Sequence, residues 1–394
     1  MERKGIALLV TSTVLLTCFS MPAYGQSIEE RLEKLEKEFE EQEATAKREE
    51  GADTEDSEEW KAQYKPKLRG ILRGKYEYSP DLNASRFEVR NARISLSGSL
   101  PLRSVYKIEI DLCDETEIKM KDCWVGLLPA KDLRLSIGQQ RLPFTIDAHR
   151  NPSEQFFSNR SFIGKQVGDV RDVGVLGSYS FKTKDAKGER TLLAMAGGIF
   201  NGSNITEQRD AWHKDINYSA RILFYPVRQL AIVPSIQHTA IADRKAHYTS
   251  VDIGVSWHSE TLHLEAEYLR KNYSDNAFKA CPAVNSMAIY RMPIRSKSVK
   301  FFDAISLLAR YDYMGDHSDG KKGFATDNNG NTTSALNITD YKRHRMTLGT
   351  TFHIANKVFA TDLRINYEKY WYPDGGKAKE GELDKLVCEV AICF

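Results

Sequence analysis

The sequence predicts an all-β fold, a 16-stranded antiparallel transmembrane β-barrel preceded by a short N-terminal coiled-coil helix. Three observations lead to this prediction. From residue 67 onward, strand-length runs alternate between apolar and charged side chains, as in strands with one lipid face and one wet face. The chain holds 18 Tyr, 17 Phe and 5 Trp, enough for two aromatic girdles. Its last nine residues form an apolar stripe that ends at Phe394.

The N-terminus has the pattern of an export signal. Residues 1–25 contain a short basic start, an apolar stretch over residues 6–19 and a small-x-small site at Ala23-Tyr-Gly25. This pattern predicts a cleaved signal peptide with Gln26 as the first mature residue. A lipid-modified Cys18 is the alternative, although the residue before it fits that motif poorly. We therefore expect an exported protein.

An acidic segment follows the predicted signal peptide. Residues 29–59 hold 15 acidic and 5 basic side chains, whereas residues 60–394 carry a net charge of +11. Within residues 26–48, four apolar residues at spacings of 4, 3 and 4 match the seam of a periplasmic coiled-coil helix. A single solvated amphipathic helix is the alternative. Residues 49–64 are predicted to be a flexible acidic linker. The four seam residues are Ile28, Leu32, Leu35 and Phe39.

The remaining residues, 65–394, are predicted to form the barrel. Residues 251–258 and 262–268 alternate between apolar and polar side chains. Because backbone groups in lipid must all be paired, such strands have to close into a barrel. About 335 residues, at roughly 20 per strand with its turn or loop, give about 16 strands. The alternation alone also fits a half-buried antiparallel sheet in water. On the inner face, His263, Glu265 and Glu267 are expected to add acid to the lumen.

The C-terminal stretch is predicted to be the closing strand of the barrel. Its alternate residues are apolar and share one face, which would face lipid. These residues are Leu386, Cys388, Val390, Ile392 and Phe394. An exposed aromatic strand would invite aggregation in a soluble protein. We expect the strand that ends at Phe394 to be recognised by the barrel-assembly machinery.

The cysteines do not form a disulfide framework. Five of the six lie after the predicted signal peptide, at irregular spacing and without a C-x-x-C motif. Cys113 and Cys123 are expected on opposite faces of a hairpin. Most of the cysteines are therefore interpreted as free thiols that pack as small apolar side chains.

A series of motifs covers residues 67–226. These motifs are Phe87-Glu-Val-Arg-Asn-Ala-Arg93, Tyr106-Lys-Ile-Glu-Ile-Asp111, Lys121-Asp-Cys-Trp-Val-Gly126, Ile137-Gly-Gln-Gln-Arg-Leu-Pro-Phe144, Arg171-Asp-Val-Gly174, Phe200-Asn-Gly202 and Ala220-Arg221 with Pro226. In order and spacing they resemble the phosphate-selective porin O and P family. The resemblance implies a trimeric, sixteen-stranded outer-membrane barrel whose pore is lined by arginines and lysines. It also implies an inward-folded loop at the constriction and, in several members, a periplasmic coiled coil at the N-terminus.

Basic residues on the predicted inner faces are the candidate anion-pathway residues. A guanidinium donates two hydrogen bonds to one phosphate or carboxylate, and a narrow pore focuses the field of its lining charges. Each candidate has an alternative role, in which it solvates the wall or pairs with a neighbouring acid. Several lie in or beside the long segment 140–172, the expected inward loop. The candidates are Arg69, Arg73, Lys75, Arg93, Lys107, Arg134, Arg141, Arg150, Arg160, Lys165 and Arg171. The basic run at 342–345 is interpreted as a lipopolysaccharide-facing or interface cluster.

Together these patterns predict an anion-preferring porin in the outer membrane of a Gram-negative bacterium, with phosphate or polyphosphate as the solute that the family suggests. A structural barrel tied to the periplasm by its coiled coil and a non-selective general porin are the alternatives. The expected partners are outer-membrane lipid and lipopolysaccharide, two further copies in a homotrimer, the barrel-assembly machinery and small anions such as phosphate.

An enzyme is not expected. His238, His258 and His263 lie on neighbouring predicted strands, but no nucleophile motif accompanies them. The sequence shows no P-loop, no dinucleotide fingerprint and no metal-ligand cluster, so neither a cofactor nor a metal is expected. The acidic segment argues against a nucleic-acid partner.

Overall fold

The fold is known from a computed structural model, which describes residues 66–101, 103–114, 117–168, 170–202, 212, 217–240, 247–294, 301–320, 322–326, 332–355 and 360–394. The strands belong to one compact unit, residues 64–394. The predicted signal peptide, coiled-coil helix and acidic linker lie outside the described residues. In the part of the chain that is described, no helix is long and apolar enough to cross a membrane.

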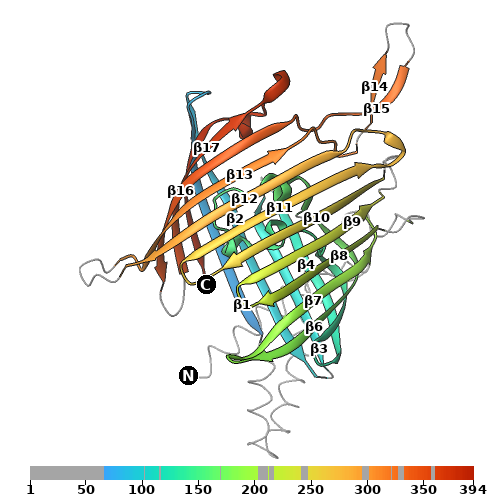
Figure 1. Cartoon of the computed structure of the whole chain (residues 1–394), viewed down its shortest axis with the longest axis vertical. Helices are drawn as coiled ribbons and strands as arrows, with labels where there is room; N and C mark the ends of the chain where they lie inside the picture. The colour runs from blue at the N-terminus through green and yellow to red at the C-terminus, as the bar shows by residue number, and fades with distance from the viewer. Residues whose placement is uncertain are drawn as a thin grey trace, which may run out of the picture. The chain divides into compact units, whose positions relative to one another are not determined.

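Sixteen strands of this unit close into one antiparallel barrel, in agreement with the prediction (Figure 1). They are β1 (Lys67–Ser79), β2 (Ala84–Leu100), β3 (Ser104–Asp114), β4 (Glu117–Ala130), β5 (Leu133–Arg141), β6 (Arg171–Asp185), β7 (Gly188–Phe200), β8 (Asn217–Val227), β9 (Leu230–Thr239), β10 (Tyr248–His258), β11 (Leu262–Tyr273), β12 (Cys281–Pro293), β13 (Ala304–Met314), β16 (Arg343–Ala355), β17 (Ala360–Trp371) and β18 (Lys385–Cys393). Strands β14 (Lys322–Thr326) and β15 (Thr332–Leu336) form a separate hairpin between β13 and β16.

The alternation in the sequence becomes an outer apolar face and an inner polar face. On β10, Val251, Ile253 and Val255 are exposed on the outside, while Ser250 and Asp252 between them are buried on the inside. A strand has a side-chain period of two, so its register decides the environment of every residue on it. The predicted faces of residues 251–258 and 262–268 are confirmed.

The closing strand β18 pairs with β1, and the predicted outward stripe is confirmed. Leu386 and Val390 lie on the outer face, whereas Val387 and Glu389 are buried inside. Gly70 and Phe394 exchange both backbone hydrogen bonds, at 2.8 and 3.0 Å. A Cβ at position 70 would lie 2.2 Å from the Phe394 ring. Only glycine lets the terminal aromatic ring rest on the first strand.

The cysteines of the described chain agree with the prediction. All five are free thiols. Cys123 lies on the outer face, while the Cys113 thiol lines an internal cavity and donates to the carbonyl of Val89 at 3.2 Å. The two residues therefore occupy opposite faces of the hairpin.

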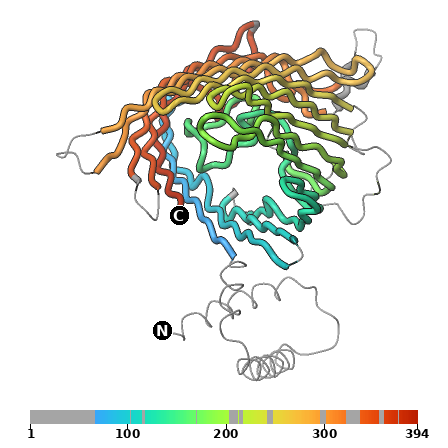
Figure 2. Tube along the Cα trace, turned by 60° about the horizontal axis from the view of Figure 1, so that its bottom comes forward, coloured from blue at the N-terminus to red at the C-terminus, as the bar shows by residue number. Residues whose placement is uncertain are grey.

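The segment between β5 and β6, residues 142–170, folds into the barrel as the sequence predicted. Figure 2 shows it inside the ring of strands. It contains the short helices η1 (Asp147–His149), η2 (Pro152–Glu154) and η3 (Gly164–Gly168). We call residues 142–170 the inner segment. The other short helices are η4 (Ser274–Asn276), η5 (Pro373–Gly375) and η6 (Glu380–Glu382).

Apolar packing holds the inner segment against one side of the wall. Phe144, Phe162 and Ile163 are almost fully buried against wall residues such as Leu269 and Met314. Burying one such side chain stabilises by about 1.5–3 kcal/mol. Two further contacts lie on the same side. They are Phe157 against Met287, Ile289 and Leu308, and Ile146 against Ala231 and Val233. The inner segment is therefore anchored on β9–β13.

Candidate functional site

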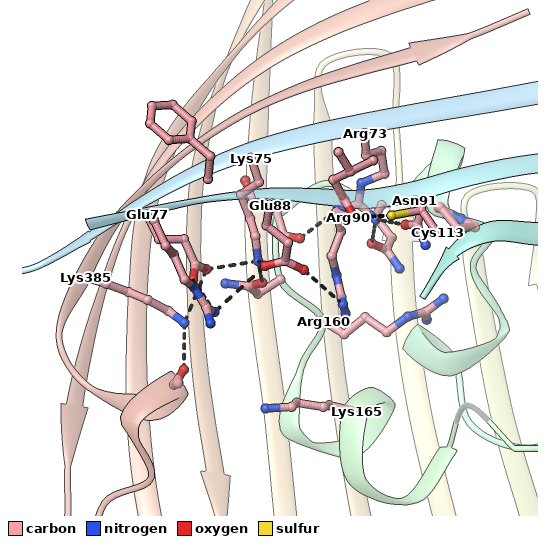
Figure 3. Close-up of a pocket in the computed structure, with 18 of the residues that line it drawn as sticks. Arg73, Lys75, Glu77, Glu88, Arg90, Asn91, Cys113, Arg160, Lys165 and Lys385 are labelled. Atoms are coloured by element: carbon pink, nitrogen blue, oxygen red, sulfur yellow. Dashed lines mark hydrogen bonds and ion pairs between the residues drawn. The ribbon is translucent and has the colours of Figure 1, made fainter. Parts of the chain in front are cut away.

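A cavity of about 720 Å³ remains between the inner segment and the opposite wall (Figure 3). Among the described residues that line it, nine are basic and two are acidic. The basic residues are Arg73, Lys75, Arg86, Arg90, Arg93, Arg160, Lys165, Arg345 and Lys385, and the acidic residues are Glu77 and Glu88. We call this space the basic cavity. Its walls come mainly from β1, β2 and the inner segment.

A β-bulge on β2 brings additional arginines into the basic cavity. Arg73 pairs with Asn91 and Gly74 pairs with Val89, so Arg90 has no partner on β1. The extra residue reverses the alternation along β2. Consequently the inward residues differ on the two sides of the bulge. Toward the N-terminal end of β2 they are Arg86, Glu88 and Arg90, and toward its C-terminal end they are Asn91 and Arg93. Simple alternation over this stretch would place only one of these two sets inside.

The two acidic residues of the cavity are surrounded by basic ones. Lys75 Nζ lies 3.0 Å from Glu77 and 2.8 Å from Glu88. Arg86 Nη2 lies 2.5 Å from Glu77, and Lys385 Nζ lies 3.4 Å from it. Figure 3 shows Lys75, Glu77, Glu88 and Lys385 together on one side of the space. Four cations therefore share two carboxylates when Arg90, 3.4 Å from Glu88, is included.

Arg73 connects the wall to the inner segment. Its guanidinium pairs with Glu389 at 2.6 Å and donates to the Ser158 carbonyl at 2.7 Å and to Gln155 at 2.8 Å. The side chain is buried, and its donors are directed at fixed acceptors. Arg73 thus positions the inner segment as well as contributing charge to the cavity.

Further acids lie behind the lining cations rather than among them. Arg93 pairs with Asp111 at 2.8 Å, and Arg345 pairs with Asp312 at 2.8 Å, but neither acid lines the cavity. Because Coulomb energy falls with distance, an anion in the cavity is closer to the guanidinium groups than to the acids behind them. This layering orients the arginines and leaves the cavity surface positive.

Asp147 connects two parts of the inner segment to each other. This carboxylate accepts from the Ser161 backbone at 2.9 Å and from its hydroxyl at 2.7 Å, and it pairs with Arg150 at 3.1 Å. Burial alone would raise the pKa of Asp147. The positive charges of Arg150, Arg160 and Arg310 outweigh that effect and lower the pKa to about 2.

The structure brings five of the eleven predicted pathway residues to the basic cavity. They are Arg73, Lys75, Arg93, Arg160 and Lys165. Lys165 is the most open of these, with a side chain 51% exposed and 3.0 Å from Glu382. Arg160 donates to the carbonyls of Asp147 and Arg150 at 2.6 and 2.8 Å.

The other six predicted residues lie elsewhere. Arg69 is exposed near the start of β1. Lys107 and Arg171 both pair with Asp122. The remaining three are placed as follows: Arg134 lies over the Trp124 ring at 4.9 Å, Arg141 donates to the His149 carbonyl at 2.7 Å, and Arg150 pairs with Glu265. Their roles in an anion pathway stay predictions.

Glu265 and Glu267 lie on the inner face of β11, as expected, but they do not line the basic cavity. Glu265 pairs with Arg150, and Glu267 accepts a hydrogen bond from the backbone of Ile146. Both carboxylates are buried beneath the inner segment. They anchor the segment, so their charge does not face the basic cavity.

The interpretation of the run at 342–345 as a lipopolysaccharide-facing or interface cluster is wrong for Arg343 and Arg345. Arg343 and Arg345 are buried on the inner face of β16 and flank the ring of Phe162 at 4.4 and 4.7 Å. His344, which contacts Tyr311, lies on the outer face. Side chains alternate between the two faces of β16, so Arg343 and Arg345 share one face and His344 lies on the other.

Four basic residues of the cavity were not among the predicted pathway residues, namely Arg86, Arg90, Arg345 and Lys385. The first two depend on the bulge, which alternation does not reveal. Of the three histidines named from the sequence, His258 and His263 have ring centroids 5.6 Å apart. Across the described ranges, no three His, Cys, Asp or Glu side chains gather in a way that could hold a metal ion.

Solved porins share this fold at low sequence identity. An anion-selective porin from Comamonas acidovorans has a TM-score of 0.54 and 13% identity, over 83% of this chain and 98% of that chain. OmpF of Salmonella typhi, in complex with daunomycin, has a TM-score of 0.57 and 13% identity, with 84% and 98% covered. OmpT of Vibrio cholerae has a TM-score of 0.51 and 10% identity, with 84% and 98% covered.

At these identities the likeness establishes the porin fold, a sixteen-stranded barrel, and nothing finer. No protein-family model and no curated protein matches the sequence. The resemblance to phosphate-selective porins therefore stays a prediction.

Proposed function

We propose that the protein is an outer-membrane porin whose water-filled lumen prefers small anions. The observation that carries this proposal is the excess of nine basic over two acidic side chains around the basic cavity, counted over the described residues. Low-dielectric walls focus the field of such charges and raise the local concentration of anions. Rings and ladders of arginine and lysine are the usual construction of anion and phosphate pores.

The finer parts of the proposal come from the motifs. The phosphate-selective porin O and P family suggests phosphate or polyphosphate as the solute. An anion-selective porin among the solved structures of the same fold supports the preference for anions. In this proposal the protein lies in the outer membrane of a Gram-negative bacterium, with its N-terminus in the periplasm. It is a channel and not an enzyme.

The assembly proposed for the protein is a homotrimer surrounded by lipid and lipopolysaccharide. The apolar outer face supports contact with lipid, since residues such as Phe87, Val125 and Ile137 are 85%, 60% and 58% exposed. The strand that ends at Phe394 is the proposed contact for the barrel-assembly machinery. A structural barrel and a general, non-selective porin are the competing functions.

The test is the reversal potential of the purified protein in a planar bilayer under a KCl gradient, repeated with phosphate added. A reversal potential near that of chloride, with current reduced by phosphate, is the expected result. A weakly selective or cation-selective conductance would favour the general porin and contradict the anion preference. Absence of conductance would favour the structural barrel.

A further inference from the structure

The carboxylate of Glu88 lies among three cations inside the basic cavity. Its Oε2 atom is 2.8 Å from Lys75 Nζ and 3.8 Å from Arg86 Nη2, and its Oε1 atom is 3.4 Å from Arg90 Nη1. Figure 3 shows Glu88 between Lys75 and Arg90. Both oxygens are thus engaged, each by a different part of the cluster. A carboxylate or phosphate guest would meet the same arrangement.

Glu88 differs from the other acids around the cavity in its freedom to leave. Its side chain is 27% exposed, whereas those of Glu77 and Glu389 are 6% and 0% exposed. When Glu88 moves away, Lys75 keeps its partner Glu77 at 3.0 Å. Departure of Glu88 therefore leaves no buried charge without a partner, which is the costly outcome for an ion pair.

The backbone explains why the cluster exists at this point. Glu88 and Arg90 lie on the inner side of β2 just above the bulge, and Arg86 lies one step further along the same face. A strand without the bulge would carry either this set or Asn91 and Arg93 on its inner face. The bulge therefore places the basic residues Arg86 and Arg90 on the same inner face as Arg73 and Arg93.

We propose that Glu88 is an internal competitor, which occupies an oxyanion-binding site formed by Lys75, Arg86 and Arg90 until a permeating oxyanion displaces it. The inference rests on the anion channel proposed above and adds a specificity-determining residue to it. The guests are anions with two or more charged oxygens, such as phosphate and carboxylates, because they can span Arg90 and Lys75 as Glu88 does. Chloride has a single charged centre and cannot bridge the two sides.

An internal competitor lowers the apparent affinity for the guest, because the guest can bind only while the site is free. If Glu88 occupies the site for nine-tenths of the time, the apparent affinity for the guest falls roughly tenfold. Weak binding is what a conducting pore needs, because an ion that binds too tightly does not leave. Glu88 would thus favour oxyanions over chloride while keeping their release fast.

The experiment measures the phosphate concentration that halves the chloride current of the full-length protein in planar bilayers. The variants are Glu88→Gln, Glu88→Asp and the control Glu260→Gln. Glu88→Gln removes the charge of the competitor and should lower the half-blocking concentration roughly tenfold. Glu88→Asp keeps the charge but is one methylene too short to reach all three cations, so it should also lower that concentration. Glu260 lies exposed after β10, and its variant should match the wild type.

Glu88→Asp separates a tethered competitor from a simple change in the field of the pore. If Glu88→Asp behaves like the wild type while Glu88→Gln binds phosphate more tightly, only the field has changed and the inference is overturned. An unchanged half-blocking concentration in Glu88→Gln would overturn it as well. A wild-type conductance without anion preference rejects the proposed function itself, and that result is read before any variant is compared.

Discussion

The two sides of the barrel wall have opposite relations to the inner segment. On β12 and β13, inward residues such as Met287, Leu308 and Met314 are apolar and pack against it. On β1 and β2, inward residues such as Arg73 and Lys75 are charged and face the basic cavity. The first side holds the segment mainly by burial, while the second faces the basic cavity and contacts the segment through Arg73. The half of the wall that the segment covers therefore decides which charges line the basic cavity.

The largest effect is expected from removing the apolar anchor. Phe162→Ala deletes a buried ring that packs on the wall and lies between Arg343 and Arg345, and such deletions cost about 3–5 kcal/mol. The inner segment should detach, so single-channel conductance and protease sensitivity of the segment should both rise. Ile137→Ala on the outer face, where the side chain is 58% exposed, is the control. Unchanged conductance in Phe162→Ala would show that packing does not hold the segment.

A smaller effect is expected from protonating Asp147. Its pKa of about 2 in the folded protein lies below the ordinary value of 3.8, so ionised Asp147 stabilises the folded segment. This stabilisation, about 2 kcal/mol, is fully present above pH 4 and is lost as the pH falls through 2. Conductance recorded from pH 6 to pH 2 should become unstable only below pH 4. Asp147→Asn should show that instability already at pH 6, and a steady conductance in that variant would contradict this role.

The thiol of Cys113 offers a direct probe of the charge in the basic cavity. We expect a negatively charged methanethiosulfonate reagent to modify this thiol roughly tenfold faster than a positively charged one, because nine of the charged residues that line the cavity are basic and two are acidic. The thiolate attacks the sulfenyl sulfur and releases methanesulfinate, so the change in conductance reports the rate. Cys113→Ser is the blank. Equal rates for the two reagents would mean that the lining cations are fully neutralised by the acids behind them.

The smallest effect is expected on the permeability ratio, when the charge of one basic residue is reversed. We compare a residue that lines the cavity with one that does not. Arg90→Glu should lower the chloride-to-potassium permeability ratio roughly fivefold, about 1 kcal/mol, since it adds a negative charge to the lining. Arg171→Glu should change the ratio less, because Arg171 pairs with Asp122 and does not line the cavity. A larger shift for Arg171→Glu would place the selective region on β4–β6 and would reverse the comparison.

The sequence located the inner segment better than it located the cavity. Residues 140–172 were predicted to be the inward loop because the segment is long and the family resemblance implies such a loop, and the structure places residues 142–170 inside the barrel. The wall that receives the segment also left a signal. The inner faces of β12 and β13 carry apolar residues such as Met287 and Leu308 among polar ones such as Arg310 and Asp312, while Tyr290 and Leu307 lie outside. A strand facing only water and lipid would not need apolar residues on both faces.

Arg90 and Arg345 show the limits of alternation. Period two predicts an inward set only while the strand stays regular, and the unpaired Arg90 changes the set halfway along β2. For Arg345 the period was present in the sequence, but an isolated basic run does not show which of its two faces is the inner one. Strand pairing across β13, β16 and β17 decides that question.

The sequence by itself determined the barrel, its strand number, its outward faces and the inward course of one long segment. These properties follow from periodicity, length and the need to pair every backbone group in lipid. The tertiary structure alone decided which charges meet. Glu265 and Glu267 became anchors because the inner segment lies on them, and Glu88 joined Lys75, Arg86 and Arg90 because of one bulge. Coulomb interactions depend on distances between residues far apart in the chain, and only the closed barrel sets those distances.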